Sequence, residues 1–181
     1  MNGRVAVTGA LAGLAVFLWS SLAHMVLPIG DLGVSQLPGE AAVLATLSEN
    51  VQQPGLYVFP VEKDPAKWEQ AYRDHPHGVL ALVPAGGPLD FGRRLAVELA
   101  TDVLCGWLAA FLFVAALPVF GNWKTGALAG ATLGAFASLS IDFSYWNWYD
   151  FPTTYLAGQL IDQAVGWAIG GLILGWRLGR R

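Results

Sequence analysis

Residues 155–176 read YLAGQLIDQAVGWAIGGLILGW, a largely apolar stretch with one carboxylate, Asp162, near its middle. The stretch is long enough to cross a bilayer as a helix, which takes roughly 20 residues for about 30 Å of hydrocarbon. A lone strand cannot satisfy its backbone groups in lipid, so a helix is expected. A charged side chain at the bilayer centre costs about 2.5–3.5 kcal/mol on insertion scales. Asp162 should therefore face protein, which predicts a bundle of several membrane helices.

Three further runs have the same character. Hydrophobic residues make up 55% of the 181 positions and charged residues only 13%, whereas soluble domains carry about 25% charged residues. The apolar residues concentrate in runs that each reach the length of a membrane-crossing helix. The sequence therefore predicts an all-α membrane bundle of four transmembrane helices. They occupy residues 1–27, about 95–120, about 125–143 and about 153–176.

The segment between the first two runs, residues 28–92, is expected to form a small extracytoplasmic α/β cap. It contains, in order, a helix in LPGEAAVLATLSENV, a strand in GLYVFP, a helix in DPAKWEQAYRDH and a strand in GVLALVP. Proline and acidic residues mark the helix starts, and prolines bound the first strand. Because a two-stranded sheet is marginal in water, we expect the cap to lean on the outer ends of the spans. Residues 93–181 then form one integral domain with the first helix and the cap.

Basic residues orient the four spans. With an even number of spans both termini share one side of the membrane, and the segments on that side contain no acid. The opposite segments, residues 28–92 and the turn around Asp150, mix acids and bases. The positive-inside rule therefore places both termini in the cytoplasm and residues 28–92 outside it. The basic residues on the cytoplasmic side are Arg4, Lys124, Arg177, Arg180 and Arg181.

The first run has a second interpretation. Arg4, the apolar stretch and SLA at residues 21–23 also resemble a signal peptide with its cleavage site. Cleavage would leave three spans. The apolar run continues past Ala23 to Leu27, however, and Trp19 with His24 suits a membrane interface. We therefore expect a retained helix.

Small residues recur every four positions in the third and fourth runs. Residues four apart share one face of a helix, and ridges of small residues let helices approach closely in lipid. We expect the two ridges to contact each other in an antiparallel hairpin, with residues 144–152 as its loop. Alternatively, one ridge, or Gly9 with Gly13 in the first run, is a homodimer face. The ridges are Gly126, Gly130, Gly134, Ser138 and Asp142 in the third run, and Gly158, Asp162, Gly166 and Gly170 in the fourth.

The ionisable groups of the spans fall in the outer half of the predicted bundle. At 1.5 Å per residue, Asp162 lies roughly 13 Å below the outer end of its run, and Asp102 lies at about the same level in the second run. Glu98 is one turn above Asp102 on the same face. These groups predict a polar pocket that is open to the outside and closed below. Its candidate residues are Asp102, Asp162, Glu98, Asp142, His24 and Ser138. We expect the nearest polar neighbours of Asp162 to come from the second and third spans.

Three kinds of chemistry fit such a pocket. Arg93 or Arg94 turning inward to Glu98 would make a structural salt-bridge network. Two buried acids could instead share a proton, as in a proton- or cation-linked transporter or channel subunit. Carboxylates with an imidazole could also bind Mn, Fe or Zn, as in a metal-dependent membrane enzyme. The candidate ligands in that last case are His24, Asp102 and Asp162.

Aromatic residues mark the boundary between the third and fourth runs. Tyr and Trp are enriched where membrane helices meet the headgroups, so the block SYWNWYDFP predicts an interfacial belt that anchors the hairpin. The alternative is a set of rings that stack on a ligand. The residues concerned are Tyr145, Trp146, Trp148 and Tyr149.

Three motifs resemble those of a known family. GLYVFP at residues 55–60 fits a GxYxxP loop motif, WNWYDFPTTY at residues 146–155 contains an aromatic NWYxF motif, and DQAVGWAIGGL at residues 162–172 lies within the last run. Together they resemble a family of small bacterial four-span inner-membrane proteins to which no activity is assigned. The resemblance covers most of the chain and implies a bacterial inner membrane and the topology given above. It carries over no functional residue.

Motifs of known enzymes are missing from the sequence, which has no P-loop, H-E-x-x-H, G-x-S-x-G or paired-cysteine motif. The net charge of −3 and the scarcity of basic patches give no reason to expect nucleic acid. The runs also lack the inverted repeat of a secondary transporter. The sequence therefore favours a non-enzymatic structural, accessory or small-ligand-binding membrane protein without a cofactor. Its expected partners are the lipid bilayer and either a second copy of the chain or another membrane protein.

Overall fold

The computed structural model describes residues 2–179, which are mostly helical and divide into two compact units. The first unit comprises the chain up to Val34, Asp90–Asn147 and the chain from Phe151; the second comprises Ser35–Leu89 and Trp148–Asp150. In chain order the elements are α1 (Gly3–Met25), α2 (Glu40–Asn50), β1 (Gly55–Phe59), the 3-10 helix η1 (Pro65–Lys67), α3 (Trp68–Asp74), β2 (Gly78–Leu82), α4 (Phe91–Ala115), α5 (Leu117–Phe120), α6 (Trp123–Tyr149) and α7 (Thr153–Gly179).

Three helices of the first unit, α1, α4 and α6, are long and apolar enough to cross a membrane. The fourth predicted span corresponds to α7, which is as long as α6 but is not among these three helices. Its first half contains Gln159, Asp162 and Gln163, and these polar side chains lower its hydropathy. The length and composition of the other three helices are compatible with a membrane protein.

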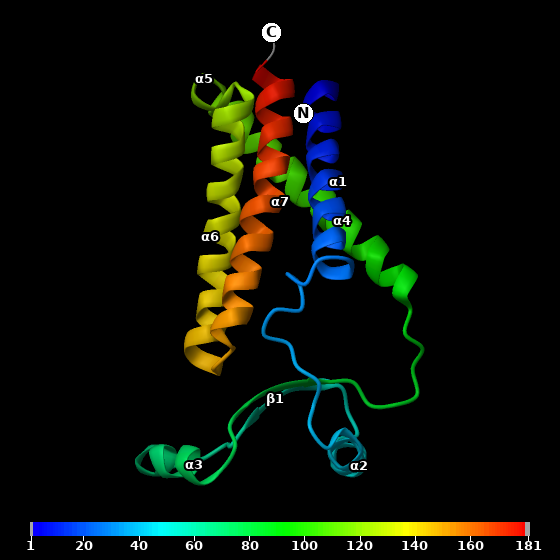
Figure 1. Ribbon diagram of the computed structural model, residues 1–181, viewed down its shortest axis with the longest axis vertical. Coiled ribbons are helices and arrows are strands. Elements are labelled where there is room, and N and C mark those ends of the chain that lie inside the picture. The colour runs from blue at the N-terminus through cyan, green and yellow to red at the C-terminus, as the bar shows by residue number, and fades with distance from the viewer. Residues whose placement is uncertain (1, 180–181) are drawn as a thin grey trace. The chain divides into compact units, whose positions relative to one another are not determined.

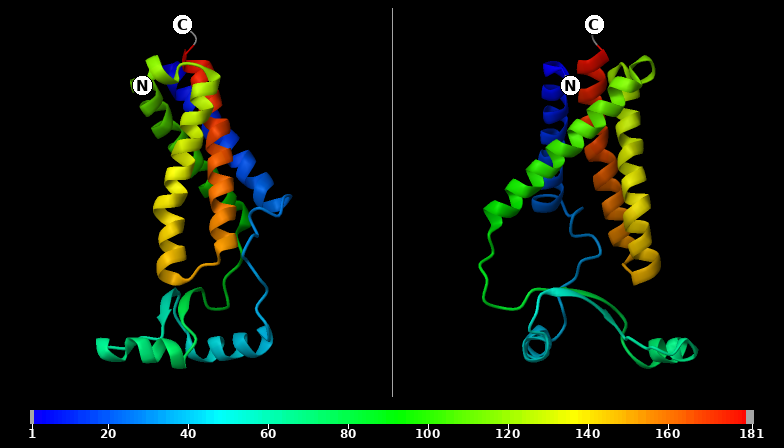
Figure 2. Two further views of the ribbon diagram at one scale, coloured as in Figure 1. Left: turned by 60° about the vertical axis from the view of Figure 1, so that its left-hand side comes forward. Right: turned by 180° about the vertical axis from the view of Figure 1, so that it is seen from behind.

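α7 is the central helix of the first unit (Figure 1). It lies between α6 and α1, and α4 crosses α1 and α7 obliquely (Figure 2). We call the end where α1 begins and α7 ends the terminal end, and the opposite end, where α6 turns into α7, the hairpin end. Among the described residues, α7 has more buried positions than α1, α4 or α6. The central position thus gives α7 the most buried positions of the four long helices.

The apolar core lies in the half of the bundle toward the terminal end. Small residues of α1 and α4 let the helices approach, and larger side chains of α4 and α7 fill the space between them. The core residues are Val5, Ala12, Ala109, Ala110, Phe113, Leu174 and Leu178. At the same end Arg4 donates to the carbonyl oxygen of Arg177, and the Arg177 Nε–H donates to the Thr8 hydroxyl at 3.4 Å. Arg180 and Arg181 lie outside the described residues.

The glycine ridge of α6 packs on α7, as predicted. A Cβ atom added to Gly130 would collide with the carbonyl oxygen of Trp167, and Gly126 and Gly134 are similarly close to the backbone of α7. The two helices therefore touch backbone to backbone, the geometry that small residues permit in lipid. The glycines of α7 that face this ridge are Gly171 and Gly175.

The predicted ridge of α7 faces a different helix, so the prediction that the two ridges meet is wrong. Gly166 packs against the Trp19 ring and Gly170 against Val16, both on α1, while Gly158 contacts the segment that follows α1. The glycines of α7 that face α6, Gly171 and Gly175, are shifted by one residue along the chain from the four-residue series that contains Gly166 and Gly170. One residue rotates a helix by about 100°, so α7 presents two separate faces of small residues.

Gly9 and Gly13 of α1 pack against α4. Gly106 of α4 lies against the carbonyl oxygen of Gly9, and a Cβ atom on Gly13 would collide with the carbonyl oxygen of Asp102. The Trp107 Nε1–H of α4 donates to the carbonyl oxygen of Ala6 at 2.9 Å. All the surfaces considered as homodimer faces are therefore covered by other segments of the same chain.

Several helices do not end where the apolar runs end. α6 continues to Tyr149, so the loop expected over residues 144–152 shrinks to the three residues between the helices. An apolar run marks the thickness of the hydrocarbon, whereas backbone hydrogen bonds continue until the chain is forced to turn. Here the turn comes at Asp150, whose φ is 55°, and at Pro152, which opens α7. At the terminal end, α4 stops at Ala115, and the separate short helix α5 begins at Leu117 with Pro118 in its first turn.

The second unit contains the helices and strands expected between residues 40 and 82, in the expected order. β1 and β2 pair antiparallel, with Leu56 opposite Ala81 and Val58 opposite Val79. The Asp64 side chain caps η1 by accepting from the backbone N–H of Ala66 at 3.1 Å. None of its helical residues is buried. The unit is thus a two-stranded sheet with short helices and little core of its own.

Candidate functional site

Asp162 is buried where α7 passes α1, and only 4% of the residue is exposed. The Ser20 hydroxyl donates to its Oδ2 at 3.5 Å, and the Nε2 of His24 lies 3.6 Å from the same oxygen. The Trp19 Nε1–H donates to the main-chain carbonyl of Asp162 at 3.1 Å. The other carboxylate oxygen, Oδ1, is buried and has no hydrogen-bond partner. Both contacts to Oδ2 are long for hydrogen bonds, so the carboxylate is poorly satisfied.

These polar neighbours of Asp162 correct one prediction. Ser20, His24 and Trp19 come from the first helix, which was not expected. Of the two expected spans, the second contributes the carboxylates described next, and the third contributes no residue to the cavity that Asp162 lines. The rise of a helix gives the depth of a residue but not the neighbour that its face meets. A signal was nevertheless present, because Ser20 and His24 are four residues apart and so share one face of α1.

Two further carboxylates approach from α4. Asp102 and Glu98 are one turn apart and line a cavity of about 40 Å³ together with Asp162. The Oδ2 of Asp102 is buried and, like Oδ1 of Asp162, lacks a hydrogen-bond partner. The close contact at Gly13 holds the backbone of Asp102 against α1. We call this cavity the carboxylate pocket; its remaining lining residues are Val16, Trp19, Ser20, Gln163, Gly166 and Trp167.

The charges in the carboxylate pocket are of one sign. Glu98 and Asp162 both repel the Asp102 carboxylate electrostatically, and no Lys or Arg lines the cavity. Burying an uncompensated carboxylate is costly, and the cost is higher in lipid than in a soluble protein. The cavity can hold a few water-sized groups, since one water needs about 10–15 Å³ of such space. The pocket is therefore suited to a small positively charged or hydrogen-bond-donating group.

The salt-bridge network considered for this region is not formed. Within residues 2–179, neither Arg93 nor Arg94 makes an ion pair with Glu98. The same part of the chain has no group of three His, Cys, Asp or Glu side chains that could hold a metal ion. His24, Asp102 and Asp162 thus do not converge as a set of three metal ligands.

Two residues of the predicted pocket lie elsewhere. Ser138 and Asp142 are on α6 and do not line the carboxylate pocket. Ser138 is 1% exposed and its hydroxyl has no hydrogen-bond partner. Asp142 is half-buried and close enough to Tyr155 of α7 to interact with it electrostatically. Both residues continue the four-residue spacing of the α6 ridge. That ridge meets a different face of α7 from the one that packs on α1.

The aromatic residues at the hairpin end pack on one another. The Trp146 Nε1–H donates to the Thr153 hydroxyl at 3.1 Å, which joins the end of α6 to the start of α7. The Tyr145 and Phe151 rings lie 5.5 Å apart, and Phe151 contacts Tyr155 edge-on at 5.2 Å. Trp148 and Tyr149 remain exposed. None of the four predicted residues lines the carboxylate pocket.

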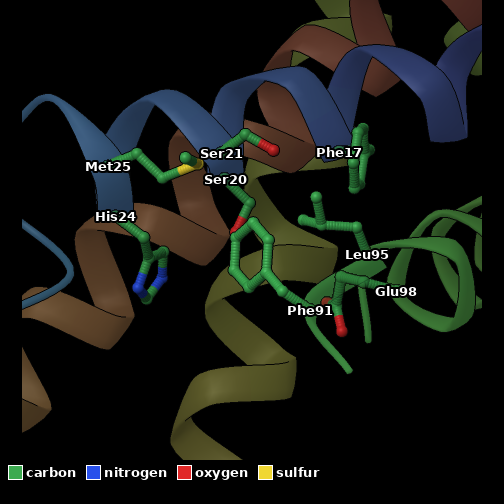
Figure 3. Close-up of a pocket in the computed structure, with 8 residues that line it drawn as sticks. All are labelled: Phe17, Ser20, Ser21, His24, Met25, Phe91, Leu95 and Glu98. Atoms are coloured by element: carbon green, nitrogen blue, oxygen red, sulfur yellow. The ribbon is translucent and has the colours of Figure 1, made fainter. Parts of the chain in front are cut away.

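A second cavity adjoins the first where α1 and α4 diverge toward the hairpin end. Its volume is about 350 Å³, and its walls are largely apolar. Figure 3 shows its side chains projecting from the two helices, with Phe17 of α1 over Leu95 of α4. Ser20 and Glu98 line both cavities. We call the second cavity the α1–α4 cleft; its residues are Phe17, Ser20, Ser21, His24, Met25, Phe91, Leu95 and Glu98.

Comparisons of the chain with protein-family models, with curated proteins and with solved structures find no match. The resemblance based on residues 55–60 and 146–172 therefore stays a prediction.

Proposed function

We propose that the chain is a four-span protein of the bacterial inner membrane that binds a small positively charged group in its carboxylate pocket and catalyses no reaction. The observation that carries the proposal is the pair of buried, unpartnered oxygens, Oδ1 of Asp162 and Oδ2 of Asp102, in one cavity. A bound cation would satisfy both oxygens and would offset the repulsion between the carboxylates.

The central position of α7 supports a fourth span. Its polar residues lower its hydropathy, but the buried Asp162 faces α1 and α4. Intramembrane acids that face a bundle interior are the usual exception to the apolar composition of membrane helices. With four spans, the basic residues at the terminal end place both termini in the cytoplasm.

The distribution of polar groups favours binding over conduction. The three carboxylates lie in the half toward the hairpin end, whereas the other half is filled by the apolar core around Phe113 and Leu174. A continuous ion path would need polar groups on both sides. The proposed site is therefore a closed pocket that is reached from one side.

The experiment uses the full chain purified in an uncharged detergent. Thermal unfolding is compared in the chlorides of ammonium, sodium and N-methylglucamine at equal ionic strength. We expect ammonium or sodium to raise the unfolding midpoint, because a ligand at 100 times its Kd stabilises the folded state by about 2.7 kcal/mol. N-methylglucamine is too large for the carboxylate pocket, and its hydroxyl-bearing chain does not match the largely apolar wall of the α1–α4 cleft, so it should have no such effect.

Matched variants locate the effect. Asp162→Asn and Asp102→Asn should each lose the cation-dependent shift. Asp142→Asn removes the same charge from a carboxylate outside the pocket and should keep it. Identical midpoints of the unchanged protein in all three salts would refute the proposed function.

A further inference from the structure

The α1–α4 cleft adds an apolar compartment to the charged one. Its volume of about 350 Å³ falls within the range of small-molecule sites, which is about 300–1,000 Å³. Phe17, Met25, Phe91 and Leu95 supply most of the wall. A simple inorganic cation would use none of this surface.

Glu98 joins the two compartments. It lines both cavities, and it forms no ion pair within the described part of the chain. Ser20 also lines both cavities, and its hydroxyl donates to Asp162. The acidic side chains thus lie at one end of a cleft whose walls are largely apolar. A ligand that fits must combine a cationic head with an apolar body.

We propose that the two cavities together bind an amphipathic amine, with its ammonium group at the carboxylates and its hydrocarbon in the α1–α4 cleft. This inference rests on the proposed function and names the class of ligand. The ammonium donates hydrogen bonds to Glu98 and to the unpartnered oxygens of Asp102 and Asp162, which are strong because they are charge-assisted. The Phe17 and Phe91 rings suit both the alkyl chain and a cation beside a π face.

A ligand of the opposite charge is disfavoured on the same grounds. The cleft contains one basic side chain, His24, and its Nε2 is directed to Asp162. A carboxylate or phosphate head would therefore meet three acids without a free cation to offset them. The apolar wall alone would accept any hydrocarbon, so the negative charge at the end of the cleft next to the carboxylate pocket selects for a cationic ligand.

The test measures the affinity of the purified full chain in uncharged detergent for n-alkylammonium ions from methyl to octyl, and for the alcohols of equal length. We expect affinity to rise about three- to fourfold for each methylene that enters the cleft. The matching alcohol should bind at least about tenfold more weakly, since it lacks the charge-assisted hydrogen bonds.

Variants separate the head from the tail. Glu98→Gln should lower the affinity for octylammonium about tenfold or more and leave the affinity for octanol unchanged. Glu98 is exposed, so this substitution should not impair folding. Leu95→Ala should reduce the rise in affinity that each added methylene gives, because it removes part of the apolar wall. Asp142 lies outside both cavities, so Asp142→Asn should change neither the affinity for octylammonium nor the rise in affinity per methylene.

Two failures are distinguishable. If methylammonium binds but longer chains gain nothing, or if the alcohols bind as well as the amines, the amphipathic ligand is refuted while the cation site stands. If no ammonium ion binds, the amphipathic amine is refuted, and if sodium also leaves the unfolding midpoint unchanged, the proposed function falls with it. If added phosphatidylethanolamine competes with octylammonium, the natural amine is a lipid headgroup. If it does not compete, the natural ligand is a free amine. Both results retain the ammonium chemistry.

Discussion

Ser138 and Asp162 both place an unpartnered oxygen in the interior, but they differ in what surrounds it. Asp162 lines the carboxylate pocket, whereas Ser138 is buried on the ridge of α6 and does not line that pocket. An unpaired buried hydroxyl costs about 1–3 kcal/mol. We therefore expect Ser138→Ala to leave the free energy of unfolding unchanged or to raise it by about 1 kcal/mol, measured by thermal unfolding in detergent. A loss of more than about 1 kcal/mol would show that the hydroxyl has a ligand or partner of its own.

At the residue scale, the depth of the acids could be predicted from the sequence and their surroundings could not. Counting the helical rise placed Asp102 and Asp162 at one level, and the structure brings them to one cavity. The rotation of each helix about its axis depends on which faces meet, and that is decided by contacts such as Gly13 on Asp102. For this reason Ser20, Trp19 and Gln163 were missed as lining residues.

At the scale of elements, the contact between α6 and α7 depends on the absence of side chains. A Cβ atom at Gly130 would collide with the Trp167 carbonyl oxygen, and backbone cannot move aside as a flexible side chain can. We expect Gly130→Ala to destabilise the purified protein by about 1–3 kcal/mol, the usual cost of overpacking. The unfolding midpoint in detergent measures this loss.

The control for this substitution is Gly92→Ala. Gly92 lies in the first turn of α4 and has only the Asp90 side chain nearby, at 3.9 Å. Alanine there should be neutral or slightly stabilising, because it has the higher helix propensity. If Gly130→Ala proved as harmless as Gly92→Ala, the close packing of α6 on α7 would be wrong.

The same helices show why element boundaries and pairings were harder to predict than element types. Apolar length identified the long helices, but Pro152 and Asp150 rather than the end of the apolar run set the turn between α6 and α7. The glycine spacing identified real packing faces. It did not reveal that α7 has a second such face at Gly171 and Gly175, one residue out of step with the first.

At the scale of the whole molecule, the proposed topology predicts the accessibility of each side. In a Cys105→Ala background, a cysteine replacing the exposed Ser48 should react with a membrane-impermeant maleimide on intact cells. A cysteine replacing Gly3, where there is open space around the backbone, should react only after permeabilisation. Labelling of the Gly3 position on intact cells would contradict the orientation derived from the basic residues.

The central claim is that Asp102 and Asp162 act on one bound cation. The most direct measurement is a double-mutant cycle on ammonium affinity, with Asp102→Asn, Asp162→Asn and the double variant. Substitutions of groups that share a ligand show coupling energies of about 0.5–3 kcal/mol, whereas the free-energy effects of substitutions at independent sites add to within about 0.3–0.5 kcal/mol. We predict that each single variant weakens binding and that the double variant departs clearly from additivity. Additive effects, or affinities equal to that of the unchanged protein, would contradict the shared carboxylate pocket.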